Sequence, residues 1–142
     1  MPYTPFGSLI PEILALEVFA VVGASRDPAK YGHRVYVTLK QSGYRVYAVN
    51  PSADTVDGDP AYPMLVNLPE TPQCIVSVVP PDVTAQAARD AGRLGVGYMW
   101  MQPGSDSTEA VNTAHAASLR TVYGGPCIMV AVRTQKARNH SR

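Results

Sequence analysis

Short apolar runs alternate along the chain with segments whose apolar residues recur at helical spacing. Each run is followed by Gly, Pro or a polar turn, a pattern that predicts buried strands. The first run, Phe19–Val22, is apolar without interruption, as is typical of a strand buried on both faces of a parallel sheet. Five strands are predicted, at 19–22, 44–49, 74–79, 97–101 and 120–123.

The segments between these strands predict helices. Ser8 can cap the first helix, and Asp106 with Glu109 forms an aspartate version of the capping box before the last. A short turn is expected near residues 64–65, at the edge of the protein. The residues after 132 are basic and lack apolar periodicity, so they predict a disordered tail. The predicted helices cover 8–17, about 32–42, 82–94 and 106–118.

Strands that are joined by helices must run parallel, with right-handed crossovers. The pattern therefore predicts an α/β protein: a Rossmann-like, doubly wound, five-stranded parallel sheet with the order 3-2-1-4-5. The chain has 142 residues, which suits one domain. We expect that domain at 1–132, including the helix at 8–17, followed by the basic tail at 133–142.

Composition excludes several classes of protein. Apolar residues make up 46% and charged residues 16%, which excludes a disordered chain. No apolar run reaches the roughly 18 residues of a membrane span, and the N-terminus lacks the basic segment of a secretory signal. We therefore expect a cytoplasmic protein that is not bound to a membrane.

The cysteines and histidines predict neither a metal site nor a catalytic group. Cys74 and Cys127 lack C-x-x-C spacing, and the three histidines are scattered. Cys127 is the only plausible nucleophile, but no His is predicted near it at a strand end. Cys74 is expected in the core, at the opposite edge of the sheet from Cys127, so no disulfide is expected.

Charge is distributed unevenly. The net charge is +1, yet residues 26–45 carry five basic residues and one acid. A local basic cluster in a nearly neutral protein favours a small anionic ligand over a long nucleic acid. A basic, solvated helix face is the alternative interpretation of this segment.

The first strand ends in a turn with the features of a phosphate site. Gly23 permits close backbone approach, and the following loop leads into a helix near Gly32, whose exposed amides and dipole attract anions. Ser25 can donate a hydroxyl hydrogen bond, and Arg26 and Lys30 can supply positive charge.

Common phosphate-binding motifs do not match this turn. The P-loop pattern is absent, and after Gly23 the next glycine is Gly32, so the dinucleotide fingerprint is absent as well. An NAD enzyme would also carry an acid after the second strand, where this chain has Asn50. NAD is therefore disfavoured.

Five motifs occur in order at the predicted strand ends and the first loop. They are Val21–Ser25, Lys30 to Gly32, Val49–Pro51, Val78–Pro81 and Trp100–Gly104. Together they resemble the small stand-alone CoA-binding domain proteins, which are similar to the nucleotide-binding half of the succinyl-CoA synthetase α subunit. The resemblance covers about residues 18 to 130. It departs at Cys127, which follows Gly125-Pro126 where the family often has an Asp-Arg pair.

The resemblance implies coenzyme A as the ligand. It places Gly23, Ala24 and Ser25 at the CoA phosphates, with Lys30 and Arg26 neutralising them. It also implies a role for six residues further along the chain. These are Asn50 and Pro51 at the adenosine end, Val79 and Pro80 beside the adenine, and Gln102 and Gly104 toward the pantetheine.

Three functions remain open. The first is a non-enzymatic module that binds CoA or acyl-CoA, as a sensor, a carrier, a homo-oligomer or the partner of a larger enzyme. The second is an NAD(P)-binding oxidoreductase or redox-sensing module. The third is a phosphate-dependent transferase with Cys127 as the nucleophile.

Overall fold

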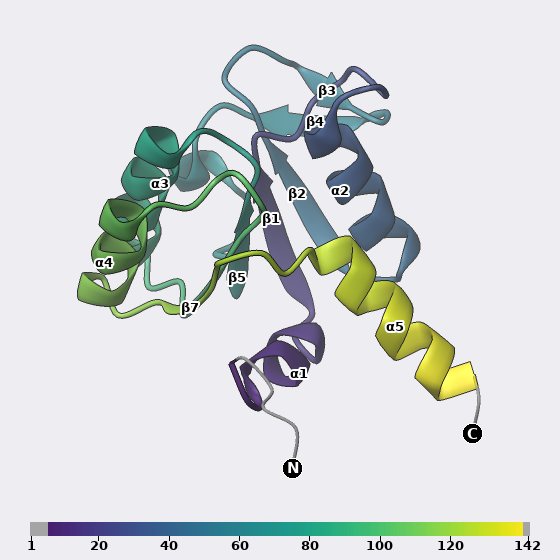
Figure 1. The fold of residues 1–142 in the computed structure, drawn as a ribbon. Coiled ribbons are helices and arrows are strands. Elements are labelled where there is room, and N and C mark those ends of the chain that lie inside the picture. Colours follow the sequence, from purple (N-terminus) through teal and green to yellow (C-terminus); the bar gives the residue numbers. More distant parts are fainter. Residues whose placement is uncertain (1–5, 141–142) are drawn as a thin grey trace.

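A computed structural model describes residues 6–140, with side chains described up to residue 137. One sheet lies between two layers of helices (Figure 1): α2 and α5 cover one face and α3 and α4 the other. The strands are β1 (Val18–Val22), β2 (Arg45–Val49), β3 (Thr55–Val56), β4 (Asp59–Tyr62), β5 (Cys74–Ser77), β6 (Tyr98–Met101) and β7 (Arg120–Val122). The helices are α1 (Leu9–Leu14), α2 (Tyr31–Gln41), the 3₁₀ turn η1 (Leu65–Asn67), α3 (Pro81–Arg93), α4 (Thr108–Ala116) and α5 (Ile128–His140).

The sheet has seven strands in the order β3-β4-β2-β1-β5-β6-β7. All neighbouring strands are parallel except β3 and β4, which form an antiparallel hairpin. The five predicted strands are confirmed as β1, β2, β5, β6 and β7, and so is the Rossmann-like α/β class. Two short strands were not predicted.

The predicted strand order is wrong. In the predicted numbering, the five predicted strands follow the order 2-1-3-4-5 rather than 3-2-1-4-5. The reason is the extra strand β4, which pairs with the outer edge of β2 through Ala48↔Ala61 and Val49↔Tyr62. The next strand, β5, therefore pairs with the free edge of β1, from Phe19↔Cys74 to Val22↔Ser77.

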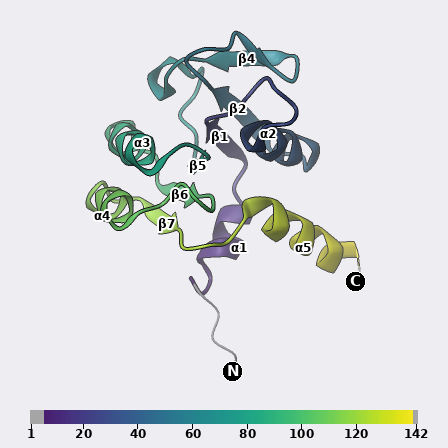
Figure 2. The same cartoon turned by 45° about the horizontal axis from the view of Figure 1, so that its top comes forward.

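Two separate cores lie on the two faces of the sheet. Figure 2 shows the helices that cover them, with α3 and α4 on one side of the sheet and α2 and α5 on the other. Every residue of β1 is buried, which confirms a strand covered on both faces. Trp100 and Phe19 belong to the core under α2 and α5, whereas Ile75 and Met99 face α3 and α4. Cys74 is fully buried in the first of these cores, as predicted.

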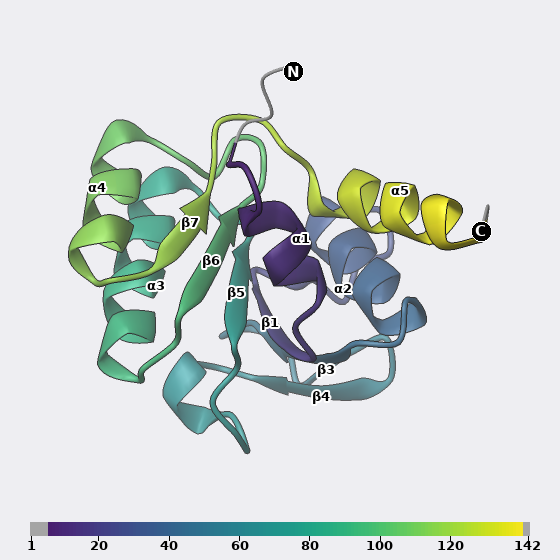
Figure 3. The same cartoon turned by 90° about the horizontal axis from the view of Figure 1, so that it is seen from below.

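The C-terminal segment forms a helix, so the prediction of a disordered tail at 133–142 is wrong as far as residue 140. Ile128, Met129 and Val132 are buried and anchor the first turns of α5 beside α2. The residues that follow include good helix formers such as Arg133, Gln135, Lys136 and Ala137, which continue the helix from this anchor. Residues 141 and 142 lie outside the described part. Seen from below in Figure 3, the end of α5 extends beyond the sheet.

Details at the helix starts also differ from the sequence analysis. Ser107, and not Asp106, caps α4: its Oγ accepts a hydrogen bond from the Ala110 amide at 3.0 Å. The carboxylate of Asp106 accepts one from the Gly124 amide at 2.9 Å and joins two loops. Ser8 stands at the N-cap position of α1, but its side chain makes no capping hydrogen bond.

None of the helices in the described residues is long and apolar enough to cross a membrane.

Candidate ligand-binding site

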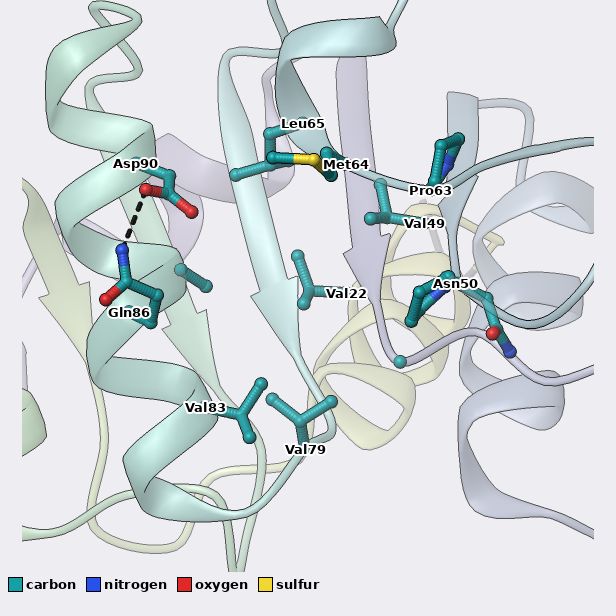
Figure 4. A pocket seen from close by; sticks show the side chains of 13 residues that line it. Val22, Val49, Asn50, Pro63, Met64, Leu65, Val79, Val83, Gln86 and Asp90 are labelled. Carbon is teal, nitrogen blue, oxygen red and sulfur yellow. Dashed lines mark hydrogen bonds between the residues drawn. The ribbon is translucent and has the colours of Figure 1, made fainter.

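A cavity of about 350 Å³ opens at the carboxyl ends of β1 and β2, where Val22 and Val49 are the last strand residues. Helix α3 forms one wall and the segment leading into η1 another (Figure 4). Aliphatic side chains and prolines make up most of the lining. The cavity lies beside β1 and β5, where the direction of strand addition reverses, which is the usual ligand position in such sheets.

The structure brings four of the predicted site residues to this cavity: Gly23, Asn50, Pro51 and Val79. The loop that follows Gly23 contains Ala24 and Ser25, and Gly32 lies in the first turn of α2, packed against Gly23. Arg26 and Lys30 are exposed on that loop. The remaining three predicted residues do not line the cavity; they are Pro80 at the N-cap of α3, buried Gln102 and exposed Gly104.

Gly23 and Gly32 allow strand and helix to approach closely. Gly23 has φ +99°, and a Cβ there would lie 2.7 Å from Val79 Cγ1. A Cβ on Gly32 would lie 2.0 Å from the carbonyl oxygen of Gly23. Gly32 thus performs the helix–strand packing role of the last glycine in a dinucleotide fingerprint, although its spacing differs.

The loop between these glycines is held by its own hydrogen bonds. Ser25 Oγ accepts from the Asp27 amide at 3.1 Å, and Asp27 Oδ1 accepts from the Ala29 amide at 3.0 Å. The loop ends at Lys30, the N-cap of α2, whose side chain makes no capping hydrogen bond. The first-turn amides of α2 therefore lack a side-chain cap, and its first turn contains no acid, which suits an anion.

The basic segment 26–45 divides into paired and unpaired charges. Lys40 forms ion pairs with Asp57 and Asp59, and Arg45 pairs with Glu70. Among the described residues, Arg26, Lys30 and Arg34 take part in no ion pair, and the guanidinium of Arg34 lies over the ring of Tyr31. The positive charge left for a ligand is thus concentrated at the start of α2.

Asn50 fastens the end of β2 to the glycine loop. Its Nδ2 donates to the Ala24 carbonyl at 2.8 Å, and its Oδ1 accepts from the Ser52 amide at 2.7 Å. The side chain positions both loops beside the cavity. An acid at this position would lack the amide donor toward Ala24.

Gln102, Tyr31 and Cys127 form a polar cluster in which Gln102 is buried and the other two side chains are half-buried. Gln102 Nε2 donates to Tyr31 Oη at 2.7 Å, and Gln102 Oε1 accepts from the Ile128 amide at 2.8 Å. Tyr31 Oη and Cys127 Sγ are 3.2 Å apart. The cluster joins the end of β6 to the starts of α2 and α5.

This cluster changes the acidity of both ionisable groups. Burial raises the pKa of Cys127, but hydrogen bonds from Tyr31, Gln102 and the backbone amides of Val130 and Met129 outweigh burial and leave it below its ordinary value. Burial and the contact with Cys127 raise the pKa of Tyr31 to about 12. The phenol therefore stays protonated at neutral pH and is available to donate to the Cys127 thiolate.

Sequence analysis missed the residues on the far side of the cavity. The turn near Met64 and Leu65 is confirmed as η1 and its preceding residue, but it lines the cavity rather than an edge of the protein. On α3, the feature of the sequence that could have pointed to the cavity is a pair of polar residues on the same helix face as apolar ones. Val83, Gln86, Ala87 and Asp90 share one face at helical spacing and all line the cavity.

An apolar cavity beside a glycine turn and an uncapped helix N-terminus, at the carboxyl edge of a doubly wound sheet, is the arrangement of a nucleotide-binding domain. Residues 17–133 match the family described as "CoA binding domain". The chain belongs to this family, which confirms the resemblance found in its sequence.

Solved structures and curated proteins agree with this assignment. A hypothetical protein from Pyrococcus horikoshii is 30% identical, with a TM-score of 0.86 over 94% of this chain and 98% of that one. A conserved hypothetical protein from Pyrococcus furiosus is 38% identical, with a TM-score of 0.75 over 80% of this chain and 97% of that one. The α subunit of an ADP-forming acetate–CoA ligase II from Pyrococcus furiosus is 32% identical over 120 residues, which cover 77% of this chain and 26% of that subunit. The chain spans about a quarter or less of the curated relatives it matches.

Proposed function

We propose that the protein binds coenzyme A or an acyl-CoA without transforming it. The adenosine end occupies the apolar cavity, between Val79 on one side and Asn50 and Pro51 on the other. The phosphates lie at the glycine loop and the start of α2. The observation that carries the proposal is the position of this uncapped helix start, which packs against Gly23 at the cavity and carries Arg26, Lys30 and Arg34, none of them in an ion pair with a described residue.

The pantetheine arm extends toward the end of β6. Gln102 uses both ends of its amide within the protein, so we assign it a role in positioning this region rather than direct binding. Gly104, exposed in the next turn with φ +90°, leaves space for the arm because it has no side chain.

Binding without catalysis fits the surroundings of Cys127. Within the described part of the chain, the side chains that form hydrogen bonds with its sulfur are Tyr31 and Gln102. Neither is a general base at neutral pH, because the amide does not titrate and the pKa of Tyr31 is raised to about 12. A carrier, a sensor or a subunit of a larger CoA-dependent enzyme would need only the binding that we propose.

Calorimetry with Lys30→Ala tests the phosphate site. Loss of one charge-assisted hydrogen bond should weaken CoA binding about tenfold to a hundredfold, while the melting temperature stays constant because Lys30 is exposed. Lys136→Ala, an exposed lysine on α5, is the matched control and should bind CoA as the wild type does. Equal affinities for both variants would exclude Lys30 from the site.

A comparison of ligands tests the alternative of an NAD(P)-binding protein. CoA at about 100 times its dissociation constant should stabilise the fold by roughly 2.7 kcal/mol, which raises the melting temperature by several degrees. NAD and NADP at the same concentration should have a much smaller effect. A shift with either dinucleotide as large as that with CoA would refute the proposal.

A further inference from the structure

Three polar side chains line the otherwise apolar cavity, and they differ in how fully their hydrogen-bonding groups are used. Asn50 donates to the Ala24 carbonyl and accepts from the Ser52 amide. Gln86 donates to Asp90 and accepts from Arg89 at 3.0 Å. Asp90 uses one oxygen only.

The used oxygen of Asp90 fixes the direction of the other. Oδ1 accepts from Gln86 Nε2 at 3.0 Å and from Arg93 Nη1 at 3.4 Å. Among the residues that the structure describes, none donates to Oδ2. Figure 4 shows Oδ1 joined to Gln86, with the second oxygen directed away from α3 toward the side of the cavity where Met64 and Leu65 lie.

We propose that Asp90 determines the base specificity of the site by accepting a hydrogen bond from the exocyclic amino group of a 6-aminopurine. This inference rests on the proposed CoA function and identifies the part of the ligand that α3 recognises. Adenine presents a donor at its 6-position, which matches the open carboxylate oxygen. A 6-oxopurine presents an acceptor there, so the lone pairs of its 6-oxygen and of the Asp90 carboxylate oxygen would repel each other.

The surroundings favour the base over the ribose as the partner of Asp90. Met64 and Leu65 lie on the side of the cavity that Asp90 faces and offer apolar contact to an aromatic ring, and Val83 lines the same cavity about two turns earlier on α3. Ribose hydroxyls and phosphates would leave several polar groups against these side chains without partners. The phosphate-binding features lie elsewhere, at Gly23 and the start of α2.

The test compares CoA with its 6-oxo analogue, in which hypoxanthine replaces adenine, by calorimetry on the full chain. The wild type should bind CoA about tenfold to a hundredfold more tightly, as expected for one charge-assisted hydrogen bond. Asp90→Asn presents an amide that donates as well as accepts, so the preference should fall to threefold or less. Asp90→Ala should reduce the preference equally.

Asp82→Asn is the matched control, because Asp82 is an exposed acid on the same helix that does not line the cavity. It should keep the wild-type preference, and melting curves should show that all variants are folded. A wild type that binds both ligands within threefold, or an Asp90→Asn variant that keeps a tenfold preference, would overturn the role of Asp90 while leaving CoA binding intact. Equal weakening of both ligands by Asp90→Asn would assign the carboxylate to a shared part such as the ribose and would also overturn it. Failure of the wild type to bind either ligand would overturn the proposed function itself.

Discussion

Replacing Gly32 by alanine should destabilise the protein although the position is helical. In a free helix, alanine is more favourable than glycine by about 1 kcal/mol. Here the added Cβ would lie 2.0 Å from the Gly23 carbonyl oxygen, 3.0 Å from its carbonyl carbon and 3.1 Å from Val78 Cγ2. Both closest atoms are backbone atoms, which cannot rotate away, so α2 must move by about 1 Å.

The expected loss can be worked out from these contacts. Overpacking in a closely packed core costs about 1–3 kcal/mol, and a contact with backbone belongs at or above the upper end of that range. Subtracting the helix preference of about 1 kcal/mol leaves a net loss of roughly 2 kcal/mol or more. For a chain of 142 residues this corresponds to a melting temperature lower by about 7 °C.

Thermal unfolding and calorimetry with CoA measure the two consequences of Gly32→Ala. The displaced start of α2 should also weaken CoA binding, because its amides move away from the glycine loop. Gly97→Ala is the control: nothing lies within 4 Å of the added Cβ, so the melting temperature should change by no more than about 2 °C. A Gly32→Ala protein that melts at or above the wild-type temperature would refute the close-packing argument.

Two further predictions concern the start of α5. The alkylation rate of Cys127 by iodoacetamide should rise with pH around a midpoint below that of an ordinary thiol. Tyr31→Phe should move this midpoint to higher pH because the thiolate loses a hydrogen-bond donor, and an unchanged midpoint would contradict the hydrogen bond between Tyr31 and Cys127. Ile128→Ala should lower the free energy of unfolding by about 2–4 kcal/mol because it leaves a cavity in the core, whereas Val130→Ala, at an exposed position, should change it by less than about 0.5 kcal/mol. Denaturant titrations measure both values, and equal effects would show that α5 does not pack against α2 and the sheet.

Strands β1 and β5 could be predicted from sequence because every residue in them is buried, and burial on both faces leaves nearly continuous apolar runs. The hairpin β3–β4 could not be predicted in this way, because β3 has only two residues and β4 has no buried residue and contains Pro60. Its one local signal is Asp57-Gly58, where both residues have positive φ, as a tight type I′ turn requires. The strand order depends on this hairpin, since β4 occupies the edge of β2 that the predicted order gave to β5.

Helix α5 shows a different limit of sequence analysis. Its apolar residues are confined to the first turns, where Ile128, Met129 and Val132 meet α2 and the sheet. A single apolar patch at one end gives no helical period over the remaining turns. The basic part of the helix therefore has the same composition as a disordered tail, and only the packing of its first turns distinguishes the two.

Within the site, residues at strand ends were easier to find than those that approach from other segments. Gly23, Asn50, Pro51 and Val79 follow strands directly, and the topology of a doubly wound sheet brings strand ends together. The wall formed by η1 and α3 depends on how residues 64–65 pack against a helix that begins at Pro81. No spacing in the sequence encodes that contact.

The identity of a polar residue does not show whether its side chain stabilises the fold or binds the ligand. The number of its hydrogen-bonding groups that the protein leaves unused distinguishes the two roles. Gln102 follows a strand and was expected to face the ligand, yet the fold uses both ends of its amide. Asn50 does the same at the end of β2. Asp90 lies in the last turn of α3, was not selected by the sequence analysis, and keeps one oxygen open toward the cavity. We therefore expect α3 to determine which ligand binds, through Asp90, whereas the polar side chains of Asn50 and Gln102 at the strand ends maintain the shape of the site.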